Sequence, residues 1–78
     1  MGTQKLPELS GRKVIKALKK DGFQNHSQKG GHVKLKKTLD DGKVLTVIVP
    51  AHGKIGKKLL KTIINQAGLN NRLFLELL

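Results

Sequence analysis

A glycine pair followed by a histidine, Gly30-Gly31-His32, is the segment of this sequence best suited to carry chemistry. Glycines let a backbone approach a phosphate closely, and a histidine directly after them on a strand is placed for proton transfer. The reaction that suits these groups is attack of a ribose 2′-hydroxyl on its own phosphate. That reaction needs a base, an acid and positive charge on the phosphate, but no metal ion. The flanking residues that could supply the charge are Lys29, Lys34 and Lys36.

The same segment also has a plain structural interpretation. A glycine pair beside a histidine usually forms only a hairpin turn. From the residues alone, catalysis at His32 and a purely structural turn are therefore both open.

A second group of basic residues surrounds the start of a helix that we predict over residues 57–67. Their spacing of three and four places them along one side of the helix start, where unpaired amides and the helix dipole already favour phosphate. A solvated lysine face would show the same pattern, so the group is a candidate RNA-binding surface and is not diagnostic. Its members are Lys54, Lys57, Lys58 and Lys61.

The two remaining histidines are candidate accessory groups. His52 follows a strand, in a loop beside the second helix, and could assist at the same site, although a solvated loop histidine is commoner. His26 is expected on the surface of a strand, with pairing to His32 as the less favoured alternative. The histidines lack the i, i+4 helical spacing of a zinc site, and Asp40 and Asp41 are expected in a turn. We therefore predict no metal site.

The charge of the chain points to a polyanionic partner. Its 16 Lys and Arg, all lysine except Arg12 and Arg72, give a formal net charge of +11 over 78 residues. This exceeds the charge of about 2–8 that keeps a small domain soluble, and it attracts polyanions through counterion release. A nucleic acid is the predicted partner, with an anionic membrane surface as the main alternative. Two Phe without Trp or Tyr argue against a sheet that stacks bases.

Length and composition predict one domain over residues 1–78, with its core in residues 10–69 and a short C-terminal helix in residues 70–78. The chain has no cysteine, which excludes disulfides and a cysteine nucleophile and favours the cytoplasm. Residues 1–8 lack the apolar stretch of a signal peptide, and no apolar run approaches the roughly 20 residues of a membrane helix. We therefore expect no membrane association.

The sequence predicts an α-β-β-β-α order. Ser10 can cap a first helix that ends at Asp21-Gly22, and Gly68 ends the second helix. Asn70 can cap a short final helix whose apolar residues pack back or meet a partner. The strands are expected over residues 23–28, 32–38 and 43–49, with turns at residues 29–31 and 40–42 and a loop over residues 51–56.

Strand alternation assigns side chains to the two faces of the predicted sheet. The helices need an apolar surface to cover, so Phe23 must share the buried face with Val33 and Leu35. We expect a three-residue turn over residues 29–31 to achieve this. The open face would then carry His26, His32, Lys34 and Lys36.

Four segments together resemble the HicA family of toxins, in the family's order, from about residue 10 to residue 69. They correspond to the family's opening helix and first strand, its Gly-x-His signature, its Val-Pro-x-His strand end and its last helix. Gly31 stands where the family commonly has serine. The segments are residues 10–23, Gln28-Lys29-Gly30-Gly31-His32, Val47-Ile48-Val49-Pro50-Ala51-His52 and residues 60–69.

The resemblance implies both a fold and an activity. The fold is α+β and double-stranded-RNA-binding-like, with a three-stranded antiparallel sheet, helices on one face and a short C-terminal helix. The activity is that of a metal-independent endoribonuclease that cleaves mRNA, without a cofactor and with His32 as catalytic general acid/base. A HicB-like antitoxin would neutralise it, so we expect a monomer when free and a hetero-oligomer with the antitoxin.

Two other functions stay open beside the nuclease. A non-catalytic RNA-binding module could use the same basic face. A protein whose main role is to bind an acidic partner would also need this charge, and that role is compatible with a toxin held by its antitoxin.

Overall fold

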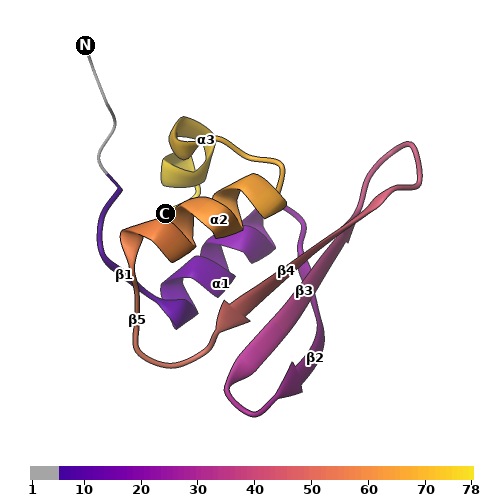
Figure 1. The fold of residues 1–78 in the computed structure, drawn as a ribbon. Helices are drawn as coiled ribbons and strands as arrows, with labels where there is room; N and C mark the ends of the chain where they lie inside the picture. The colour runs from indigo at the N-terminus through magenta and orange to yellow at the C-terminus, as the bar shows by residue number, and fades with distance from the viewer. Residues whose placement is uncertain (1–5) are drawn as a thin grey trace.

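The computed structural model describes residues 6–78, and in it a three-stranded antiparallel sheet is covered by helices on one face (Figure 1). The predicted α+β class and the α-β-β-β-α order are confirmed. Residues 1–5, which belong to the predicted domain and to the N-terminal segment expected to lack a signal peptide, lie outside the described residues. The elements are β1 (Leu9–Ser10), α1 (Gly11–Lys20), β2 (Gln24–Lys29), β3 (His32–Thr38), β4 (Val44–Pro50), β5 (Lys54–Ile55), α2 (Lys57–Gln66) and α3 (Asn71–Glu76).

The helices begin where the capping residues predict. The Ser10 hydroxyl accepts a hydrogen bond from the Lys13 amide at 3.2 Å and so caps α1. The Asn70 side chain accepts one from the Leu73 amide at 2.8 Å and caps α3. The second helix, α2, is one residue shorter than expected, because Ala67 is its C-cap.

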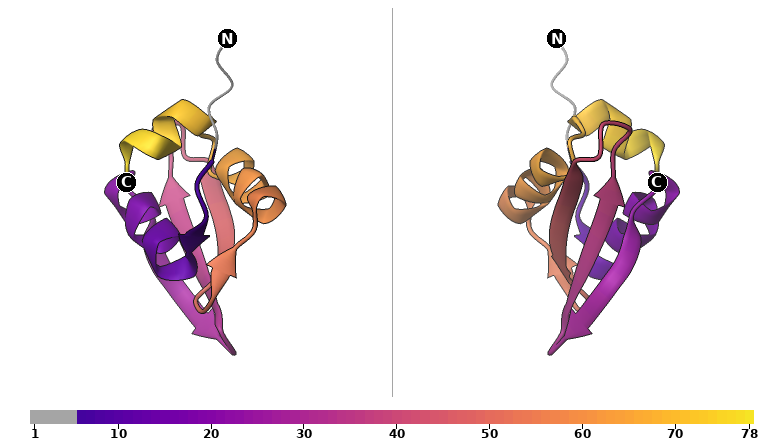
Figure 2. Two further views of the ribbon diagram at one scale, coloured as in Figure 1. Left: turned by 90° about the vertical axis from the view of Figure 1, so that its left-hand side faces the viewer. Right: turned by 90° about the vertical axis from the view of Figure 1, so that its right-hand side faces the viewer.

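The core lies between the sheet and the two main helices. The strand order is β2-β3-β4, and the right-hand view of Figure 2 looks onto the open face, with α1 and α2 behind the sheet. Along β3, Val33 and Leu35 are buried against the helices, whereas His32, Lys34 and Lys36 alternate with them on the open face. The helices contribute Val14, Ala17, Leu18, Leu60, Ile63 and Ile64 to this core.

The turn between β2 and β3 is shorter than predicted. Instead of a three-residue turn over residues 29–31, Lys29 pairs directly with His32, and only Gly30-Gly31 connects the strands. The φ angles of the two glycines are +60° and +127°. Two successive residues with positive φ are what a tight hairpin turn requires, and glycine adopts them without a steric penalty.

The extra residue that was expected in the turn lies in β2 instead, where His26 forms a bulge. The pairing with β3 shifts between Asn25 and Ser27. Beyond the bulge Asn25 pairs with Leu35, which is the pairing that a three-residue turn would also have produced. Phe23 is therefore on the buried face as predicted, with 2% of its surface exposed. The buried face predicted for Phe23 is confirmed, whereas the predicted position of the extra residue, in the turn, is wrong.

A second, very small sheet closes the domain at one end. In it Leu9 of β1 pairs with Ile55 of β5, and Ser10 pairs with Lys54. The prediction of a loop over residues 51–56 is wrong for β5, because two-residue strands are too short to show an alternating pattern. Leu9 and Ile55 are both buried, so this pair ties the segment before α1 to the segment before α2.

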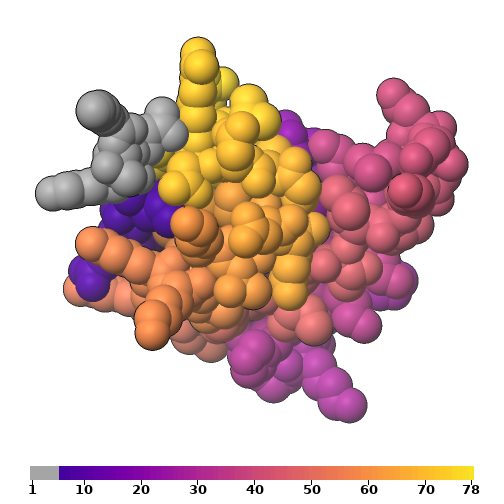
Figure 3. All heavy atoms as spheres, turned by 45° about the horizontal axis from the view of Figure 1, so that its top comes forward, coloured from indigo at the N-terminus to yellow at the C-terminus, as the bar shows by residue number. Residues whose placement is uncertain are grey.

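The C-terminal helix packs against the rest of the domain. Figure 3 shows α2 and α3 side by side on the surface, with the β3–β4 hairpin extending beyond them. Phe74 is fully buried, whereas Leu73 and Leu78 are 46% and 48% exposed. The expectation that this helix packs back is confirmed for Phe74. Within residues 6–78, no helix has the length and apolar character needed to cross a bilayer.

We predict that Phe74→Ala destabilises the whole domain. Removing a fully buried aromatic ring leaves a cavity that costs about 3–5 kcal/mol, a large part of the stability of a chain of this size. Chemical denaturation followed by circular dichroism measures the loss. The neighbouring Leu73→Ala is the control, and equal stability of the two variants would show that α3 is not part of the folded core.

Candidate active site

His32 occupies the first position of the central strand, so it has a strand on each side. It pairs with Lys29 of β2 and with Pro50 of β4. Its side chain is exposed on the open face of the sheet, directly after the Gly30-Gly31 turn. The imidazole is therefore accessible to a large substrate, while the backbone that carries it is fixed by the sheet.

His52 lies beside the same turn, although it comes from a different part of the chain. The Ala51 amide donates a hydrogen bond to the Gly31 carbonyl at 2.6 Å, which holds the loop after β4 against the turn. A Cβ atom added to Gly31 would lie 3.6 Å from Cδ2 of His52, so the imidazole ring is packed next to this glycine. The structure thus brings His52 to the turn that precedes His32.

The loop that carries His52 is held against the start of α1. The Gly11 amide donates to the Gly53 carbonyl at 3.1 Å. A Cβ atom at Gly11 would overlap the carbonyl oxygen of Pro50, so a glycine is required here by close packing. Sequence reasoning missed this contact, and the only signal for it was a glycine at the first helical position, where nothing in the helix itself demands one.

Three of the lysines predicted to bind RNA lie on the sheet around His32. Lys29 is exposed, and Lys34 and Lys36 are half-buried on the open face. None of the three takes part in an ion pair within residues 6–78, so their charge is available to a ligand. The ion pairs in that range are Lys37–Asp21 at 3.0 Å, Lys54–Glu8 at 3.7 Å and Arg72–Glu76 at 3.7 Å.

The second predicted group of lysines surrounds β5 and the start of α2. Lys57, Lys58 and Lys61 are all exposed, and Gly56 caps α2 without a side-chain hydrogen bond. Lys54 faces Glu8, but both side chains are largely exposed, and such a surface pair contributes little. The loop that carries His52 connects this group to the His32 turn, so the structure places the two basic groups on adjoining segments rather than on one element.

His26 is separate from the other two histidines. It is exposed in the bulge of β2, which confirms a surface position on a strand. It lines a pocket with Lys36, and no hydrogen bond joins it to His32 in the part of the chain that the structure describes. No three His, Asp or Glu side chains come together as a metal site among residues 6–78.

The fold and the site together define a class of protein. The helices cover one face of a three-stranded antiparallel sheet in a double-stranded-RNA-binding-like arrangement, and a histidine begins the central strand on the other face. A family described as the HicA toxin of bacterial toxin–antitoxin systems matches residues 11–69. The match covers most of the chain, so the chain belongs to the HicA toxin family. A comparison with curated proteins gave no match.

Membership of this family establishes the role of the chain and the kind of partner that it has, and the matched residues do not include every element of the fold. The chain is a toxin of a toxin–antitoxin pair, so it has an antitoxin partner. The matched residues include His32, His52 and α2, whereas β1 and α3 lie before and after the match.

We predict that Gly11→Ala destabilises the domain by about 1–3 kcal/mol and displaces the loop that carries His52, because the added methyl group overlaps the Pro50 carbonyl. Thermal unfolding measures the stability, and the NMR signals of the His52 ring report the loop. Gly56→Ala is the control, since a Cβ atom there meets nothing within 4 Å. Equal behaviour of the two variants would contradict the close packing.

Proposed function

We propose that this toxin is a metal-independent endoribonuclease that cleaves mRNA in the cytoplasm. The observation that carries the proposal is the position of His32, exposed at the start of the central strand. Lys29 lies beside it on β2, Lys34 follows on the same face of β3, and a second histidine lies beside the turn. Free toxin is proposed to be a monomer, and toxin held by its antitoxin a hetero-oligomer.

The proposed reaction is internal transesterification. His32 removes the proton from a ribose 2′-hydroxyl, and the 2′-oxygen attacks the adjacent phosphorus. The bond from phosphorus to the 5′-oxygen breaks, which leaves a 2′,3′-cyclic phosphate on one fragment and a 5′-hydroxyl on the other. The leaving 5′-oxygen receives a proton, and His52 in its protonated form is the candidate donor because of its place beside Gly31.

Charge and backbone would complete the site. The ammonium group of Lys29, next to His32 in the β2–β3 pair, is suited to stabilise the negative charge that develops on the phosphate. The Gly30-Gly31 turn has no side chains, so an RNA backbone can approach it closely. Lys34 and Lys36 extend the positive surface along the strand. The lysines of β5 and α2 extend it beyond the loop.

We predict that His32→Ala lowers the rate of RNA cleavage by about 10²–10⁴-fold, because the group that transfers the proton is lost. The measurement is cleavage of a long unstructured RNA by purified protein in EDTA. RNA binding should be retained, since the lysines are unchanged.

Other outcomes of this experiment are decisive. If wild type and His32→Ala bind RNA equally and neither cleaves it, the protein is a binding module and the nuclease proposal is wrong. If EDTA abolishes cleavage by wild type, the metal-free scheme is wrong.

His52→Ala in the same assay tests the proton donor, and an unchanged rate would exclude His52 from that role.

We predict that affinity for RNA falls steeply with salt, because each lysine–phosphate contact releases counterions. Three such contacts to a single strand correspond to a loss of roughly 20-fold between about 50 and about 200 mM salt. Titration of His32→Ala with labelled RNA measures the slope of log affinity against log salt concentration without cleavage of the RNA. Lys29→Ala should make the slope shallower by about 0.7. Lys43→Ala, at the hairpin between β3 and β4, is the control. An affinity for RNA that does not change with salt would contradict binding through phosphates.

A further inference from the structure

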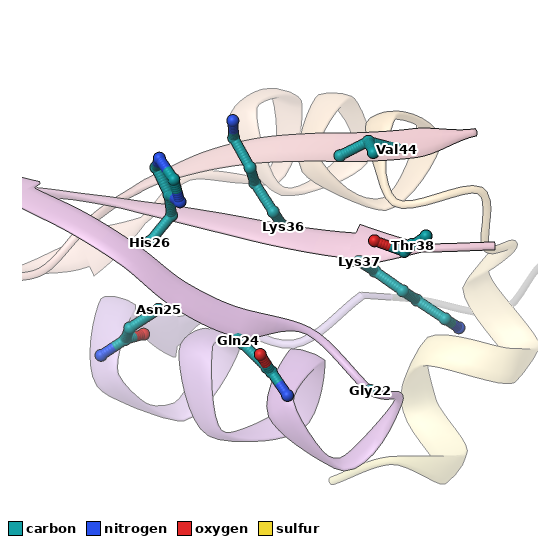
Figure 4. Close-up of a pocket in the computed structure, with 8 residues that line it drawn as sticks. All are labelled: Gly22, Gln24, Asn25, His26, Lys36, Lys37, Thr38 and Val44. Carbon is teal, nitrogen blue, oxygen red and sulfur yellow. The ribbon is translucent and has the colours of Figure 1, made fainter. Parts of the chain in front are cut away.

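A polar pocket of about 450 Å³ lies where β2 separates from β3, away from the turn that precedes His32 (Figure 4). It is large enough to hold one nucleotide, since ligand pockets of roughly 300–1,000 Å³ hold molecules of that size. The pairing of the two strands ends at Gln24 and Lys36, and the pocket opens beside this last pair. The lining residues that matter here are Gln24, Asn25, His26, Lys36, Thr38 and Val44.

The bulge in β2 supplies one of the two basic side chains of this pocket. A bulge re-aims the side chain of the extra residue, and bulges are frequent next to functional sites. His26 is that residue here, and Figure 4 shows it extending to the same side of the sheet as Lys36 of β3. Neither side chain makes an ion pair within residues 6–78. An imidazole and an ammonium group on one side of a sheet suit a phosphate.

Thr38 and Val44 suit the rest of a nucleotide, because they pair with each other on β3 and β4. Thr38 occupies an alternate position of β3 from Lys36 and therefore shares its face. Gln24 and Asn25 also border the pocket, but Figure 4 shows their side chains extending away from His26 and Lys36. Thr38 offers a hydroxyl group, and the 51% exposed Val44 offers an apolar contact for a sugar or a base. Lys37 also borders the pocket, but its ammonium group is held by Asp21 at 3.0 Å.

The pocket is connected to His32 along the open face of the sheet. His32, Lys34 and Lys36 occupy alternate positions of β3 and therefore share this face. Lys36 lies about 13 Å along the strand from His32, with Lys34 between them. A single RNA strand that follows these three residues would have one phosphate at His32 and a later or earlier nucleotide in the pocket.

We propose that this pocket is a nucleotide subsite for single-stranded RNA and that it helps to determine where the RNA is cut. His26 and Lys36 bind a phosphate, and Thr38 and Val44 contact the sugar or the base. This inference rests on the proposed nuclease function and adds a specificity-determining site outside the reacting atoms. The continuity with Lys34 and His32 favours a polymer over a free nucleotide.

The first test is the distribution of cleavage sites on a long unstructured RNA, mapped by primer extension. The variants are His26→Ala and the double variant Thr38→Ala/Val44→Ala. The matched control is Ser27→Ala, an exposed neighbour on β2 that does not line the pocket. The two pocket variants should redistribute the cuts and lower the rate at the preferred sites on the order of tenfold, while Ser27→Ala stays within about twofold of wild type.

The second test measures binding alone and does not depend on cleavage. His32→Ala is titrated with a short single-stranded RNA and, separately, with a mononucleotide, and the NMR signals of the His26 ring and of the Thr38 and Val44 methyl groups are followed. The proposal expects these signals to shift with the RNA at concentrations where the mononucleotide has no effect.

The outcomes separate this inference from the function on which it rests. Absence of cleavage by wild type would overturn the nuclease and the role of the pocket in choosing the cut, while NMR shifts with RNA would still support binding of RNA at the pocket. Cleavage by wild type with a pattern that the pocket variants leave unchanged would overturn the subsite alone. NMR shifts of equal strength with the mononucleotide would make the pocket a site for free nucleotides and would also overturn it.

Discussion

The sheet depends on the placement of one extra residue between the buried Phe23 and the tight turn before His32. With a two-residue turn and no bulge, residues 23–26 would change faces, and the Phe23 ring would leave the core. Burial of that ring stabilises the fold by about 1.5–3 kcal/mol, which favours a bulge over a regular strand. The ion pair of Asp21 with Lys37 fixes the same end of the strand. One constraint thus sets the core, the turn and the position of His26.

Most of the fold was predictable, because its signals are local. Ser10 and Asn70 cap helices through hydrogen bonds between near neighbours, and alternation along β3 assigned its buried residues correctly. The position of the extra residue was not predictable, since Lys29-Gly30-Gly31 is compatible with a turn of two or of three residues. The pairing of β1 with β5 depends on contacts between distant segments and leaves no periodic pattern in either.

The candidate site was predictable in part. The residue types singled out His32 and its flanking lysines, but nothing in the sequence placed His52 beside Gly31 or Gly11 beneath Pro50. Both arrangements result from backbone packing between segments about 20 to 40 residues apart in the chain. The pocket beside His26 was also hidden, because it exists only where two strands stop pairing.

The two-residue pairing of β1 with β5 has a consequence for motion. Short elements that few hydrogen bonds hold in place open by local fluctuation at a small fraction of the free energy of global unfolding. Opening of this pair would strain the Gly11–Gly53 hydrogen bond and loosen the loop with His52, while the three-stranded sheet kept His32 in place. Amide hydrogen exchange would then be faster at Gly11 and Ile55 than along β3. The two histidines beside the turn therefore belong to regions of different rigidity, because His32 begins a strand of the three-stranded sheet, whereas His52 lies in a loop held by the Ala51–Gly31 and Gly11–Gly53 hydrogen bonds.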